Sequence, residues 1–190
     1  MAIPLLVAAV GILSVFVFVN RGITEPTVES TVARYANELR AIGTEVPVPA
    51  NAAPNWTQLA LGRLASLKAS IKAAESIARD LEHGLAARSS ACALANAAGD
   101  TIAKELEPAR MATTKALDGL LSETKDRLKA LEAENNTLGW VGWRGSREEA
   151  ISGLVLLAHE IEMARTSADL AFTRLKNEAV VLSRLSVSCE

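Results

Sequence analysis

Apolar positions divide the chain into an uninterrupted N-terminal run and a long remainder in which they recur every three or four residues. The run covers residues 3–19, IPLLVAAVGILSVFVFV, and carries no charged side chain. At 1.5 Å per residue its helix is about 26 Å long, close to the thickness of a thin hydrocarbon core. We therefore expect residues 1–21 to form a membrane-anchor helix, whose lipid-facing side chains include Leu5, Leu6, Val7, Val10, Ile12, Leu13, Val15, Phe16, Val17 and Phe18.

Two other interpretations of this run remain open. A cleaved signal peptide begins with basic side chains and ends in a small-x-small site, and residues 18–20 form a poor site of that kind. A buried core helix normally has a polar face, whereas Ser14 is the run's one polar residue. The membrane anchor is the interpretation that the length of the run favours.

The remainder predicts an all-α fold, because one helical face is apolar and the residues between are strong helix formers. Residues 22–55 predict a short amphipathic helix followed by a proline-rich linker. Residues 56–190 predict an antiparallel bundle of three helices, near 57–98, 101–135 and 147–187, running up, down and up. The first break is expected at Gly99-Asp100, a stop followed by an N-cap. The alternative is one helix over 57–135 that pairs with the last helix as a coiled-coil hairpin.

Two cysteines predict a covalent link at one end of the bundle. Cys92 and Cys189 are equally distant from the predicted turn before the last helix, so they are level if one straight helix precedes that turn. If the chain instead turns at Gly99, Cys92 lies near the top of the first helix and Cys189 near the top of the third, at the same end of the bundle. We expect a disulfide between them, which requires an oxidising compartment. The positive-inside rule, applied to Arg21, Arg34 and Arg40, instead favours a cytoplasmic bundle. We give the predicted disulfide more weight, because it follows from the arrangement of all the long helices, whereas the charge bias comes from three arginines. We therefore expect a single-pass membrane protein with its bundle on the extracytoplasmic side.

Charge and residue composition exclude several function classes. The 20 basic and 22 acidic side chains are interspersed, which argues against the basic stripe of a nucleic-acid surface. The two histidines, His83 and His159, lack the Glu-x-x-His pairs of a di-metal bundle. Because the chain also lacks a phosphate-binding loop and a nucleophile motif, we expect no enzyme activity, no metal, no cofactor and no small-molecule substrate.

The tryptophans and asparagines mark the opposite end of the predicted bundle from the cysteines. Trp56, Trp140 and Trp143 gather there, either as an interaction patch or as an apolar lid beneath the turn. Asn55 and Asn135 each begin an Asn-x-Thr sequence, the pattern of an N-glycosylation acceptor. Patterns this short arise by chance, so they predict possible glycosylation and no more.

Taken together, these patterns favour a membrane-anchored helical bundle with a structural, scaffold or protein-interaction role. Its expected partners are the lipid bilayer, through the N-terminal segment, and a protein or a second copy, through the helical seams. Two alternatives remain: a pore-forming or fusion-like protein whose N-terminal segment inserts conditionally, and a secreted helical binding protein after signal cleavage. The sequence resembles no family that would decide between them.

Overall fold

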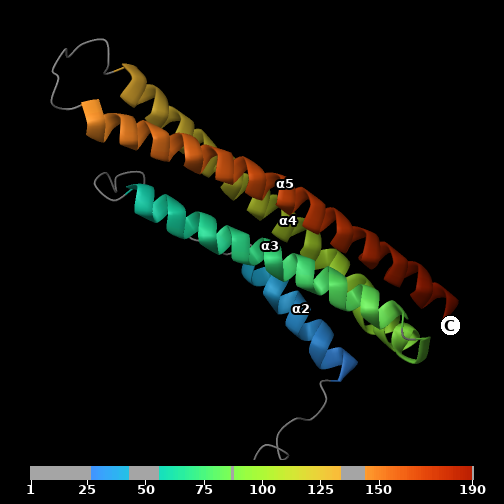
Figure 1. Cartoon of the computed structure of the whole chain (residues 1–190). Helices are drawn as coiled ribbons and strands as arrows, with labels where there is room; N and C mark the ends of the chain where they lie inside the picture. Colours follow the sequence, from blue (N-terminus) through green and yellow to red (C-terminus); the bar gives the residue numbers. More distant parts are fainter. Residues whose placement is uncertain (1–26, 43–55, 87, 134–143, 190) are drawn as a thin grey trace, which may run out of the picture.

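The computed structural model describes residues 27–42, 56–86, 88–133 and 144–189. They form four helices: α2 (Val28–Ile42), α3 (Trp56–Ala86), α4 (Arg88–Ala133) and α5 (Arg144–Ser188) (Figure 1). Over these residues the structure contains no strand, so the predicted all-α class is confirmed for this part of the chain. The helices α3, α4 and α5 lie side by side, and α2 packs against α4 and one edge of α3.

The longest helices, α4 and α5, form an antiparallel pair of 46 and 45 residues. The 31-residue helix α3 packs against both of them along part of their length. Chain direction alternates from α3 to α5, as the sequence predicted, but α3 is clearly the shortest of the three. The molecule therefore combines the two expected arrangements: a long hairpin with a third helix packed on it.

The turn between α3 and α4 lies twelve residues before the predicted one. Gly99 and Asp100 are inside α4, so the prediction of a break there is wrong. A Cβ atom on Gly99 would lie 3.8 Å from the Cα atom of Ser183, an ordinary packing distance across the α4–α5 contact. Gly84, near the end of α3, has the tighter surroundings: a Cβ atom there would lie 2.7 Å from Cδ2 of Leu94. The absence of a side chain at Gly84 lets Leu94 pack across the turn.

The core is a continuous apolar layer between the helices. On α5 one set of buried residues recurs every seventh position, which is the spacing of a coiled-coil seam: Leu154, Ile161, Ala168, Leu175 and Leu182. The buried polar residues of the described part are Thr113 and Thr124. Their hydroxyls donate to the carbonyls of Ala109 at 2.9 Å and Leu120 at 2.7 Å, so burial leaves neither hydroxyl unpaired.

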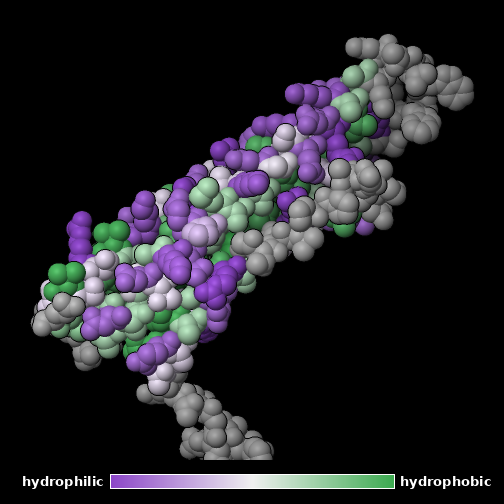
Figure 2. Space-filling view, turned by 180° about the vertical axis from the view of Figure 1, so that it is seen from behind, coloured by the Kyte–Doolittle hydropathy of each residue, from purple (hydrophilic) through white to green (hydrophobic). Residues whose placement is uncertain are grey.

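Charged side chains lie along the rims where the helices meet, and hydrophilic residues spread over the face seen in Figure 2, with apolar areas between them. Both rims of α5 carry ion pairs to the neighbouring helix. The pairs with α3 are Lys68–Glu160 at 2.6 Å and Glu82–Arg174. The pairs with α4 are Lys125–Glu162 at 3.0 Å and Asp118–Arg165 at 3.3 Å. All eight side chains are roughly half exposed. Each pair therefore adds at most about 1 kcal/mol, and its main effect is on helix register.

The prediction of a single-pass membrane protein is corrected by the structure. Within residues 27–42, 56–86, 88–133 and 144–189, no helix has both the length and the apolar character needed to cross a membrane. Charged side chains recur along each long helix, as at Glu160, Arg165 and Arg174 on α5, and interrupt any apolar stretch long enough to span a bilayer. The predicted anchor, residues 1–21 with Leu5 to Phe18, lies outside the described residues.

Candidate interaction surface

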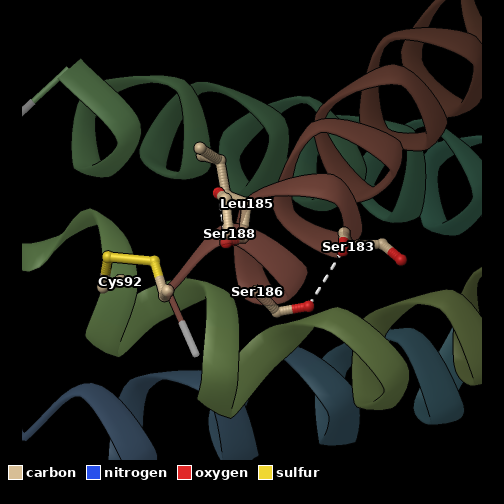
Figure 3. Close-up of a disulfide and its surroundings, with 6 residues drawn as sticks. Cys92, Ser183, Leu185, Ser186 and Ser188 are labelled. Atoms are coloured by element: carbon tan, nitrogen blue, oxygen red, sulfur yellow. Dashed lines mark hydrogen bonds between the residues drawn. A yellow bond between two sulfur atoms is a disulfide. The ribbon is translucent and has the colours of Figure 1, made fainter.

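The two cysteines close one end of the α4–α5 hairpin. Cys92 and Cys189 are joined as a disulfide, with their Cα atoms 5.8 Å apart and a sequence separation of 97 (Figure 3). This confirms the prediction that they lie together. The hairpin geometry explains it, because α4 runs without interruption from Cys92 and the two residues are equidistant from the turn. Cys92 is exposed and Cys189 is partly buried, so the bridge lies at the surface of the tip.

Local hydrogen bonds complete the last turn of α5 before the bridge. The Ser186 hydroxyl donates to the Ser183 carbonyl at 2.9 Å, and the Ser188 hydroxyl donates to the Leu185 carbonyl at 2.9 Å (Figure 3). The backbone amide of Cys189 donates to the Ser186 carbonyl at 3.2 Å. The bonds to the Leu185 and Ser186 carbonyls satisfy groups that a helix C-terminus leaves without a partner, and the disulfide then fixes the turn on α4.

Trp56 lies at the other end of the bundle as part of the core. Its exposed fraction is 4%. The Arg127 guanidinium carbon lies 4.4 Å from the ring centroid, and the indole Nε1 donates to Oε2 of Glu123 at 3.4 Å. The other two residues of the predicted interaction patch, Trp140 and Trp143, lie outside the described residues. The same is true of the predicted glycosylation sites, Asn55 and Asn135. The patch and the glycosylation sites therefore stay predictions.

A tyrosine–aspartate contact attaches α2 to α3. The Tyr35 hydroxyl donates to Oδ2 of Asp80 at 2.8 Å. Burial, followed by the hydrogen bond to Asp80 and the negative charge of that carboxylate, raises the pKa of Tyr35 to about 12. The Arg40 guanidinium of α2 lies 2.7 Å from the Glu105 carboxylate of α4, and its hydrogen bond lowers the pKa of that carboxylate. These contacts attach α2 to both α3 and α4.

The histidines stay apart in the fold. His83 follows Glu82, which pairs with Arg174, and His159 lies about four turns earlier on α5. In the described part of the chain, no group of three or more His, Cys, Asp or Glu side chains is arranged to hold a metal ion.

The surface that sequence reasoning missed is the outward face of α5, opposite the core. Leu156, Met163 and Leu170 recur every seventh residue there and are 63%, 57% and 69% exposed. On this face His159 and Thr166 lie between them, so the apolar repeat is not continuous in the sequence. A second heptad register, offset from the core residues, would have revealed it.

We call this surface the outer seam of α5. Its positions alternate in steps of three and four residues, and all are exposed: Leu156, His159, Met163, Thr166, Leu170, Thr173, Asn177 and Val180. None is an Asp, Glu, Lys or Arg. The charged residues of this part of α5 flank the seam and face the rims with α3 and α4. An uncharged strip about 36 Å long therefore lies open between two charged margins.

Comparison of the chain with protein-family models, curated proteins and solved structures found no match.

Proposed function

We propose that this chain is a non-enzymatic helical bundle that acts as a scaffold or protein-interaction component, and that the outer seam of α5 is its binding surface. The observation that carries the proposal is the exposure of Leu156, Met163 and Leu170 in one line. Large apolar side chains aligned on a surface, with polar residues at the rim, mark interaction sites. The described part of the chain already buries a complete core without them.

Rigidity supports the same proposal. The disulfide joins the tip of α5 to α4, and ion pairs on both rims hold α5 in one register. A binding surface on such a helix is ordered before the partner arrives, so association costs little conformational entropy. The seam has the periodicity of helix-in-groove or coiled-coil recognition, which reads side chains every three and four residues.

A photo-cross-linking experiment tests this function. A photoreactive phenylalanine analogue replaces Leu170 in the full chain, and a matched chain carries it at Ser76, an exposed position on α3. Irradiation in cells that express the chain should give discrete adducts from position 170. The adducts from position 76 should form at a clearly lower yield. Equal labelling from both positions, or no adduct from position 170, would contradict the proposal.

A further inference from the structure

The outer seam of α5 has an internal symmetry that identifies a partner. We infer that it binds a second copy of this chain, with the two α5 helices antiparallel about a two-fold axis beside Ala168. This inference rests on the proposed function, because it names the partner of the same surface. It follows from how seam residues and charges are distributed on either side of Ala168.

Seam residues at equal distances from Ala168 suit one another in size. In an antiparallel pair, each residue of one copy lies level with the residue equally far beyond the axis in the other. One level joins a larger apolar side chain to a smaller one, two levels join an apolar side chain to a threonine, and one joins histidine to asparagine. The side chains can therefore interdigitate without burying a carboxylate, an ammonium or a guanidinium group. The levels are Leu156 with Val180, His159 with Asn177, Met163 with Thr173, and Thr166 with Leu170.

Covering the seam leaves the Thr166 hydroxyl satisfied. Its Oγ1 already donates to the carbonyl of Glu162 at 3.2 Å, four residues earlier in the same helix. A buried hydroxyl without a partner costs about 1–3 kcal/mol, and this internal bond removes that cost. The central level of the seam therefore tolerates burial against Leu170 of the partner copy.

The charges that flank the seam are complementary across the same axis. Glu160 and Glu162 lie before Ala168, and Arg174 and Lys176 lie after it. In an antiparallel pair the same flank of each helix meets its own counterpart. Glu160 then faces Arg174 of the partner copy, and Glu162 faces Lys176 of the partner copy. A parallel pair would instead bring like charges to the same level, Glu160 beside Glu162 and Arg174 beside Lys176, which is unfavourable.

These side chains have room for a second partner. Glu160 is 53% exposed although it contacts Lys68, and Arg174 is 49% exposed although it contacts Glu82. A bond from Glu160 to Arg174 of the partner copy would join the two ion pairs into a four-membered network. Networks of this kind hold more reliably than isolated surface pairs.

One residue opposes the pairing. Asp169 lies beside the axis on one flank of the seam, so the two copies bring their Asp169 carboxylates together. The positive charge of Arg110 in the same copy lies close enough to interact with Asp169 and offsets part of the repulsion. Replacing Asp169 with asparagine should therefore tighten the dimer, which is a result that non-specific association would not give.

The size of the seam sets the expected affinity. One helix from each copy buries less than the about 800 Å² per partner of a standard stable interface. We therefore expect a reversible dimer whose Kd is on the order of 1–100 µM, and not a permanent one.

Sedimentation velocity of the full oxidised chain over a wide concentration range provides the first test. The native chain should pass from monomer to dimer, and Met163→Glu with Leu170→Glu should weaken association at least tenfold. Leu61→Glu, at an exposed leucine on α3, is the matched control and should leave association unchanged. Circular dichroism verifies that all variants keep the native helix content.

A charge exchange provides the second test. One variant carries Glu160→Lys and Glu162→Lys, and the other carries Arg174→Glu and Lys176→Glu. Each alone should lose dimerisation, because like charges then face each other across the axis. An equimolar mixture should recover it as a heterodimer, since the all-basic flanks of one variant meet the all-acidic flanks of the other.

The outcomes separate this inference from the proposed function. A native chain that stays monomeric, or whose association survives the substitutions at Met163 and Leu170, overturns the second-copy inference. So does a mixture of charge variants that stays monomeric. If position 170 nevertheless cross-links to a different protein, the interaction role stands and its partner is another molecule.

Discussion

Replacing both Cys92 and Cys189 with serine should lower the free energy of unfolding by about 2–4 kcal/mol. The disulfide closes a loop with a sequence separation of 97. Constraining the unfolded chain over a loop of that length corresponds to about 4.7 kcal/mol when the native state is unaffected. The measured value should be lower, because both cysteines lie close to helix ends and the serine variant regains some freedom at the tip of its native state.

Guanidinium unfolding followed by circular dichroism at 222 nm measures this difference. The serine variant should unfold at lower denaturant and with a steeper dependence on it, because its unfolded chain exposes more surface. In a thermal scan the midpoint should fall by roughly 5–12 °C for a chain of this size. Adding a thiol reductant to the native chain should reproduce the shift, whereas the serine variant should not respond.

Two results would refute this reasoning. A change below about 0.5 kcal/mol would show that the loop constraint does not govern stability, since typical native disulfides contribute several times more. A large loss of helix content at low denaturant would show that the bridge holds the bundle together and does more than close its tip.

Three further predictions follow from burial, ionisation and backbone geometry. Leu175→Ala should lower the free energy of unfolding in denaturant by about 2–5 kcal/mol, because Leu175 is fully buried. Leu170→Ala should lower it by under about 0.5 kcal/mol at protein concentrations too low for dimerisation, because Leu170 is exposed. The chain's single tyrosine, Tyr35, should ionise near pH 12 when its absorbance at 295 nm is followed, and ionisation near pH 10 would contradict this. The raised pKa of Tyr35 stabilises the folded state below pH 10, and this contribution is lost as pH rises towards 12. Gly153→Ala should stabilise the fold by about 0.5–1 kcal/mol, since a Cβ there meets nothing within 4 Å, whereas Gly84→Ala should give no gain because Leu94 must move.

The helical seams and the cysteine pair could be predicted because they depend on periodicity and symmetry. On α3 the steps alternate between three and four residues, and the structure buries every member of the series: Leu64, Leu67, Ile71, Ala74, Ala78 and Leu81. Cys92 and Cys189 reach the same end of the bundle with or without a turn at Gly99, so their pairing could be predicted although the position of that turn was wrong.

The turn between α3 and α4 could not be predicted because its local sequence gives the wrong signal. Glycine followed by aspartate at Gly99-Asp100 is typical of a helix end, yet packing against α5 keeps it helical. The informative glycine, Gly84, precedes the actual turn and is explained only by the position of Leu94.

The outer seam of α5 could not be predicted for a different reason. A leucine or methionine at every seventh position looks like part of the core until the residues that form the core are known. Once Ile161 and Leu175 occupy the interior, Met163 and Leu170 lie opposite it and need another explanation. The sequence contains both registers, but only the structure shows which one the bundle already buries.

Distances between spin labels on two copies test the antiparallel pairing most directly. Labels at Ser167→Cys, beside the axis, should give a short intermolecular distance, roughly 15–25 Å including the label arms. Labels at Gly153→Cys lie 15 residues from Ala168, so the copies should separate them by about 45 Å at 1.5 Å per residue. Double electron–electron resonance should therefore report one short and one long distance. Equal short distances at both positions would indicate parallel helices, and no intermolecular signal at concentrations above the Kd would contradict the dimer.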